Sequence, residues 1–84
     1  MNNIEILKKK IIYRSEHRGS KEMDILLGSF VKKYINTFSK TDLIDLEKFL
    51  NIKDETLYKW YLNQSIEDII PINNVSTKFK SFRL

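Results

Sequence analysis

The stretch RSEHRGSKEMDILLGSFVKKY, residues 14–34, joins a densely charged segment to the clearest helical pattern of the 84-residue chain. In its second half, apolar residues recur three and four positions apart, as they do on the buried face of an amphipathic helix. These residues are Met23, Leu26, Leu27, Phe30 and Tyr34. The charged segment before them contains the first of only two glycines and the only histidine. The stretch therefore predicts a helix that follows a short charged joint.

Another helical pattern precedes the joint. It predicts a helix from about Ile4 to His17, with Arg14 and Arg18 continuing its inward stripe. The apolar residues of the stripe are Ile4, Leu7 and Ile11. We expect Gly19 to end this helix in the left-handed conformation, which costs glycine little. We expect Ser20 to cap the helix that follows.

Gly28 lies inside the second predicted helix, on the side away from its apolar stripe. A glycine within a helix costs about 1 kcal/mol relative to alanine. We therefore expect another part of the chain to pack closely against this position.

Helical signals continue downstream, and the alternation typical of strands does not occur. Ser39 and Asp42 have the spacing of a capping box and start a third predicted helix. Asp54 is expected to cap a fourth helix, which carries the largest aromatic cluster. The residues predicted to face the core from these two helices are Leu43, Leu46, Phe49, Leu50, Leu57, Tyr58, Trp60 and Tyr61.

The last part of the chain predicts one more short helix. Residues 65–68 are expected to add a single turn before Pro71, which breaks the chain because the residue before a proline avoids helical geometry. Val75, Phe79 and Phe82 outline the final helix. We therefore predict an all-α protein, a single small bundle of about five helices over residues 1–84, with residues 1–3 and 83–84 frayed.

The composition limits the class of protein. Hydrophobic residues make up 42% of the chain and aromatic residues 12%, which suits one domain with one modest core. The chain has no cysteine, which fits a reducing compartment. No apolar run approaches the roughly 20 residues of a membrane-spanning helix, and residues 1–10 lack the order of a signal peptide. We expect a cytoplasmic protein without membrane insertion.

The net charge of +4 is unevenly distributed. Residues 1–41 contain nine Lys and Arg against four Asp and Glu, whereas residues 42–69 contain three against seven. A protein that wraps nucleic acid more often has one continuous basic face. The asymmetry fits electrostatic steering toward a protein partner at least as well. Charge alone leaves both kinds of partner, and a merely solvated surface, open.

Few residues are available for catalysis. With no cysteine and one histidine, the chain has almost no material for a metal site or a nucleophile–base pair. His17 is expected near the C-terminal end of the first helix, where it interacts favourably with the helix dipole. Gly19 and Gly28 alone cannot form a phosphate-binding loop. We predict no enzyme, no metal site and no catalytic residue.

The order of residues around the joint resembles that of a known family. Residues 18–22 read RGSKE and match the RGxxE motif of the succinate dehydrogenase assembly factors, the FAD flavinylation factors of the SdhE type. The likeness continues through Asp24 and Phe30, and DETLYKW, residues 54–60, resembles a later segment of the family. It covers about residues 4–62 and agrees with the family in length, helix count and the proline that follows.

This resemblance implies a chaperone-like assembly factor. Such a factor binds the flavoprotein subunit of succinate dehydrogenase and promotes the covalent attachment of FAD to a histidine of that subunit. The fumarate reductase flavoprotein is a further candidate client. We expect a monomer that holds no cofactor stably and does not bind nucleic acid. The residues expected at the contact with the partner are Arg14, Arg18, Gly19, Glu22 and Asp24.

Two other functions stay open at this point. The basic first two helices and the tail from Lys78 to Arg83 fit a small nucleic-acid-binding protein, which predicts strongly salt-dependent affinity. The aromatic fourth helix fits a structural or oligomerisation module, which predicts self-association. Without the family resemblance, the residues favour a joint that is only a helix boundary, with Gly19 as a cap and its charges solvated.

Overall fold

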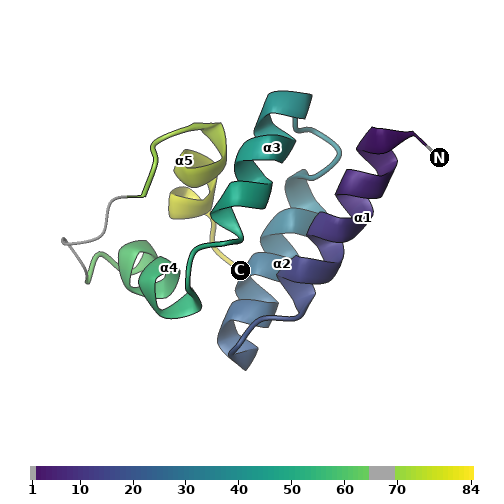
Figure 1. Ribbon diagram of the computed structural model, residues 1–84. Helices are drawn as coiled ribbons and strands as arrows, with labels where there is room; N and C mark the ends of the chain where they lie inside the picture. Colours follow the sequence, from purple (N-terminus) through teal and green to yellow (C-terminus); the bar gives the residue numbers. More distant parts are fainter. Residues whose placement is uncertain (1, 65–69) are drawn as a thin grey trace.

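The computed structural model describes residues 2–64 and 70–84, and the turn expected at residues 65–68 lies outside them. The described residues form five helices, which confirms the predicted all-α class. The helices are α1 (Asn3–Glu16), α2 (Lys21–Tyr34), α3 (Lys40–Phe49), α4 (Asp54–Tyr61) and α5 (Asn74–Ser81). Figure 1 shows α1 and α2 as a helical hairpin beside α3, and α5 packs against α3.

The predicted caps of α2 and α3 are confirmed, and that of α4 is wrong. Ser20 caps α2 with its side chain, and Ser39 and Asp42 form the reciprocal capping box of α3. At α4 the N-cap is Lys53, which makes no side-chain cap bond. Asp54 is instead the first residue of the helix, and its carboxylate bonds to a distant part of the chain. Asp54 therefore bonds to a residue far away in the sequence and does not cap its own helix.

The core forms where the apolar stripes of α2, α3 and α5 meet. The inward residues predicted on these helices are buried, except that Tyr34 is half-buried. Phe30 of α2 and Phe79 of α5 have no exposed surface, and their rings pack edge to face with centroids 5.2 Å apart. Such ring pairs stabilise a fold beyond the area that they bury. The aromatic residues therefore join helices that are far apart in the sequence.

On α4 the prediction that every residue of the aromatic cluster faces the core is wrong for Tyr58. Leu57 and Tyr61 are buried, and Trp60 is half-buried with its ring edge-on to Phe49. Tyr58, in contrast, is exposed. A short helix at the edge of a bundle buries one stripe only, and Tyr58 lies outside that stripe.

Gly28 is buried against α1, as expected from its cost in a helix. A Cβ atom at this position would lie 3.5 Å from Cγ of Glu16 and 3.8 Å from the carbonyl oxygen of Ser15. Both are ordinary contact distances, so the glycine marks close packing of the hairpin and leaves room for one methyl group.

Hydrogen bonds attach Asn2 and Arg83, near the two ends of the chain, to their neighbouring helices. Asn2, expected to be frayed, caps α1 through its side chain, and Arg83 donates to the carbonyl oxygen of Lys80.

The longest helices, α1 and α2, have 14 residues each. Among the helices described, none is long and apolar enough to cross a bilayer.

Candidate partner-binding site

A short joint, residues 17–20, connects α1 to α2. Helix α1 ends at Glu16 with His17 as its C-cap, and the ring of His17 stacks on that of Tyr13. The expectation that Gly19 ends α1 in the left-handed conformation is wrong, because no glycine of the described chain has a positive φ. The joint turns without a left-handed residue, and bonds from other elements set its shape.

Arg18 points into the protein, and its side chain is only 9% exposed. Nη1 donates to the carbonyl oxygen of Leu50 at 2.7 Å, and Nη2 donates to that of Ile52 at 3.1 Å. These carbonyls lie at the end of α3 and in the turn after it. The last carbonyls of a helix lack partners within the helix and attract cations. Arg18 therefore ties the joint to the turn between α3 and α4.

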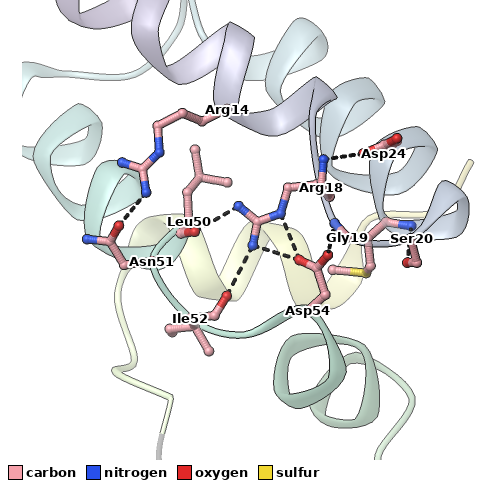
Figure 2. A network of polar contacts seen from close by, with 10 residues as sticks. Arg14, Arg18, Gly19, Ser20, Asp24, Leu50, Asn51, Ile52 and Asp54 are labelled. Carbon is pink, nitrogen blue, oxygen red and sulfur yellow. Dashed lines mark hydrogen bonds and ion pairs between the residues drawn. The ribbon is translucent and has the colours of Figure 1, made fainter.

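Asp54 completes this network from the start of α4 (Figure 2). Oδ1 accepts a hydrogen bond from Nε of Arg18 at 2.7 Å and lies 2.7 Å from Nη2. Oδ2 accepts a hydrogen bond from the backbone N–H of Gly19, also at 2.7 Å. Charge-assisted bonds of this kind are stronger than neutral ones. Both oxygens of one carboxylate thus connect α4 to the joint.

Two successive backbone amides of the joint donate to carboxylates. The N–H of Arg18 donates to Oδ1 of Asp24, and the N–H of Gly19 donates to Oδ2 of Asp54. Asp24 belongs to the first turn of α2, whereas Asp54 comes from α4. Backbone amides near the interior require an acceptor, and these two carboxylates supply it. Together they fix the backbone of the joint from both sides.

Gly19 lies close to the carboxylate of Asp54. A Cβ atom at this position would lie 3.3 Å from Oδ2 of Asp54, which is tighter than ordinary contact. That oxygen is already bonded to the N–H of Gly19 and cannot move away without lengthening the bond. What the joint uses at this position is therefore the missing Cβ of glycine and not a left-handed backbone.

Arg14 makes a second connection between α1 and the α3–α4 turn. It lies in the last turn of α1, four residues before Arg18, and Nη2 donates to the side-chain oxygen of Asn51 (Figure 2). The last turn of α1 and the joint are therefore both attached to residues 50–54.

Glu22 differs from these residues in having no internal partner. It lies in the first turn of α2 and is exposed, and its side chain makes no hydrogen bond or ion pair with any residue in the described part of the chain. Glu22 lines two hollows: one of about 410 Å³, shared with Gly19 and Tyr58, and one of about 260 Å³, shared with Ile25 and Leu84. Its carboxylate is therefore available to a partner molecule.

The five predicted contact residues thus have different surroundings in the structure. Arg14, Arg18 and Asp24 bond to other parts of the chain. Gly19 is exposed although its N–H bonds to Asp54, and Glu22 is exposed without such a bond. Contact between any of them and a partner stays a prediction. Within the described ranges, no three side chains of metal-ligating type come together.

Asp54 is the residue of this site that the sequence did not reveal. Its partners Arg18 and Gly19 precede it by 36 and 35 positions. An aspartate at a helix start is ordinarily a cap, and nothing local distinguishes this one. The only available signal was the position of Asp54 in the segment DETLYKW, which resembles the family.

The fold and the joint define a class of protein: a small all-α domain with a polar, internally bonded helix joint and an unpaired carboxylate beside it. The family described as flavinator of succinate dehydrogenase matches residues 9–83. The chain belongs to this family, which confirms the resemblance seen in the RGxxE segment.

Curated relatives agree with the family assignment. The succinate dehydrogenase assembly factor 2, mitochondrial, of Scheffersomyces stipitis is 39% identical over 57 residues, which are 68% of this chain and 38% of the relative. The protein of the same name from Dictyostelium discoideum is 35% identical over 65 residues, 77% of this chain and 46% of the relative. The FAD assembly factor SdhE of Acetobacter pasteurianus is 34% identical over 59 residues, 70% of this chain and 54% of the relative.

This chain therefore spans between 38 and 54% of the length of these three relatives. No solved structure matches it.

Proposed function

We propose that this protein is an assembly factor that binds the flavoprotein subunit of succinate dehydrogenase and promotes covalent attachment of FAD to that subunit. The observation that carries the proposal is the family match over residues 9–83, which includes the whole joint. The names of the relatives support both parts, since they refer to succinate dehydrogenase assembly and to FAD assembly. The fumarate reductase flavoprotein is proposed as a further client.

The proposed contact face consists of Gly19, Glu22, Ile25 and Tyr58. All four are exposed and line the two hollows beside the joint. Ile25 and Tyr58 offer apolar surface, and Glu22 offers a charge that no described residue of its own chain neutralises. An apolar surface with one unpaired charge fits a protein partner that supplies a cation or a hydrogen-bond donor.

The proposed mechanism is positioning. The new bond forms within the flavoprotein, between its own histidine and its FAD, and the assembly factor holds the geometry in which they react. Correct positioning alone can supply about 7–11 kcal/mol in favourable intramolecular reactions. No side chain of the factor needs to act as a nucleophile or to hold the flavin.

Three further expectations stay predictions: a monomer, no affinity for nucleic acid, and a cytoplasmic location. The names of the yeast and Dictyostelium relatives contain the word mitochondrial, and that of the Acetobacter relative does not.

Reconstitution with purified flavoprotein subunit and FAD tests the proposal. Covalent flavin is measured by in-gel fluorescence of the subunit, and affinity by titration of factor into subunit. We expect the factor to raise covalent flavin. We expect Glu22→Gln to weaken binding at least tenfold, because removing one member of a buried charge pair at an interface costs about 2–5 kcal/mol. A wild-type factor that leaves covalent flavin unchanged contradicts the proposed function.

Glu5→Gln is the matched control, since Glu5 occupies the first turn of α1 as Glu22 occupies that of α2. Each carboxylate stabilises its helix dipole by about 0.3–1 kcal/mol, so both variants should lose the same small stability. Only Glu22→Gln should lose binding. If both variants bind the subunit equally well, Glu22 does not contact the partner and only stabilises the first turn of α2.

A further inference from the structure

Asp54 is the group outside the α1–α2 hairpin that bonds to the hairpin's joint through both of its carboxylate oxygens. Oδ1 accepts a hydrogen bond from Nε of Arg18 and pairs with Nη2, and Oδ2 accepts a hydrogen bond from the N–H of Gly19. The side chain of Asp54 is 18% exposed. Because Asp54 is the first residue of α4, these bonds set the position of α4 relative to the joint.

Arg18 has little capacity left for a partner molecule. A guanidinium has five N–H groups, and four contacts with Asp54, Leu50 and Ile52 already engage all three of its nitrogens. The side chain is 9% exposed. To contact a flavoprotein, Arg18 would have to leave the largely buried carboxylate of Asp54 and two carbonyl groups without their donor, which is unfavourable.

The proposed contact face is built across the same junction. Gly19 and Glu22 approach from the joint and α2, and Tyr58 approaches from α4 one turn after Asp54. Gly19, Glu22 and Tyr58 line the hollow of about 410 Å³, as does Asp54 itself. The width of that hollow therefore depends on the bonds between Asp54 and the joint.

We propose that Asp54 is a positioning residue for partner binding and that Arg18 acts inside the protein as its counter-ion, without contacting the flavoprotein. Asp54 holds the N–H of Gly19 and the start of α4 together, so that Gly19, Glu22 and Tyr58 present one surface. This inference rests on the proposed function for its partner. The part that concerns the bonds of Asp54 to Arg18 and Gly19 does not depend on the partner and can be tested on the free protein.

A double-mutant cycle on the full chain tests the inference. Asp54→Asn keeps the shape of the side chain but removes its charge and one acceptor oxygen. We expect it to lower affinity for the flavoprotein subunit at least tenfold, measured well below the melting temperature. Arg18→Gln should give a similar loss, and adding it to Asp54→Asn should give little more, because both act on the same bonds. Affinities that fall independently would mean that Arg18 contacts the partner and would overturn the inference.

The NMR signal of the Gly19 amide supplies a readout on the free protein. A bond to a carboxylate shifts the resonance of an amide proton, so Asp54→Asn should move the signal of the Gly19 amide far more than the signals of the amides in α2. An unmoved Gly19 signal overturns the inference whether or not the flavoprotein binds. If the signal moves but the wild-type protein does not bind the subunit, the proposed function has failed and not the bond.

Glu47→Gln is the control, since it breaks a salt bridge between Lys10 and Glu47 (3.0 Å) that connects α1 to α3. It should leave both affinity and the Gly19 signal unchanged. If Asp54→Asn does not fold, Gly19→Ala disturbs the same bond by placing a Cβ 3.3 Å from Oδ2 with every charge retained. Wild-type affinity in a folded Gly19→Ala variant with a shifted position-19 amide would then overturn the positioning role.

Discussion

The joint and the aromatic core hold this small protein together by different means. At the joint, Arg18 and Asp54 make short, directional bonds that leave little freedom of geometry. In the aromatic core, defined as Phe30, Phe49, Tyr61, Phe79 and Phe82, rings meet edge to face or tilted, with centroids 5.0–5.5 Å apart where they touch Phe30 or Phe79. The comparison indicates that the core supplies most of the stability, whereas the joint supplies the shape of one surface.

Energetic principles support this division. Burial of large apolar side chains is the main favourable contribution to folding and depends little on direction. A buried ion pair, in contrast, is costly to desolvate, so its net contribution to stability is small even when breaking it on one side is harmful. The joint therefore contributes to specificity of structure more than to the free energy of unfolding.

Phe79→Ala is expected to have the largest effect on stability. Phe79 has no exposed surface and touches rings from three other helices, those of Phe30, Phe49 and Tyr61. Its removal should lower the free energy of unfolding by about 3–5 kcal/mol, a large part of what a domain of this size has. Urea denaturation followed by circular dichroism measures the change.

Trp60→Ala is the comparison variant, because Trp60 is half-buried and carries Lys80 over its ring at 4.3 Å. It should cost clearly less than Phe79→Ala. Equal losses would mean that the edge of the bundle at α4 contributes as much as its centre, against the division drawn above.

Gly19→Arg tests the other side of the comparison. The added side chain covers the proposed contact face, and its Cβ presses on Oδ2 of Asp54. We expect a folded helical protein whose affinity for the flavoprotein subunit falls at least tenfold, equivalent to about 1.4 kcal/mol. Binding is measured by titration and folding by circular dichroism.

The control is Asn36→Arg, which adds an arginine at an exposed site between α2 and α3. It should bind as the wild type does. A Gly19→Arg variant that unfolds would show that the joint carries much of the stability, and the contrast with the aromatic core would fail.

Local patterns in the sequence predicted most of the fold. Helix faces and the caps at Ser20 and Ser39 depend on residues within one turn, so the information lies close together in the chain. The candidate site was harder, because its central bond joins Arg18 to Asp54 across 36 positions. Gly19 was expected to have left-handed backbone angles and to lie at the partner contact; its φ is not positive, and the structure instead brings Oδ2 of Asp54 close to where its Cβ would lie.

Gly28→Ala should change the free energy of unfolding less than Phe79→Ala does, and it should raise it. The new methyl group would meet Glu16 and Ser15 at ordinary contact distances of 3.5 and 3.8 Å. Alanine favours a helix, so we expect a gain of about 0.4–1 kcal/mol in the free energy of unfolding. Thermal unfolding detects it. A loss of stability would mean that the packing between α1 and α2 is tighter than the distances indicate.

Glu55→Gln should have the smallest effect on stability. It compares the exposed ion pair between Glu55 and Lys59 with the largely buried pair between Arg18 and Asp54. Glu55 follows Asp54 directly, but its side chain is 78% exposed and pairs with Lys59 at 2.9 Å. The hydrogen bond and the charge of Lys59 lower the pKa of Glu55 below its usual value.

A lowered pKa in the folded state means that the contribution of Glu55 to stability is present above the pKa of the unfolded chain. This contribution is lost as pH falls through the lower, folded value. Because water and salt screen an exposed pair, the melting temperatures of Glu55→Gln and wild type should be nearly equal at neutral pH and indistinguishable at acidic pH. The measurement is a pH series of thermal melts, with Asp54→Asn in parallel. A large fall in melting temperature for Glu55→Gln at neutral pH would show that exposed charges hold α4 in place. The bonds of Asp54 would then not be the main attachment of this helix.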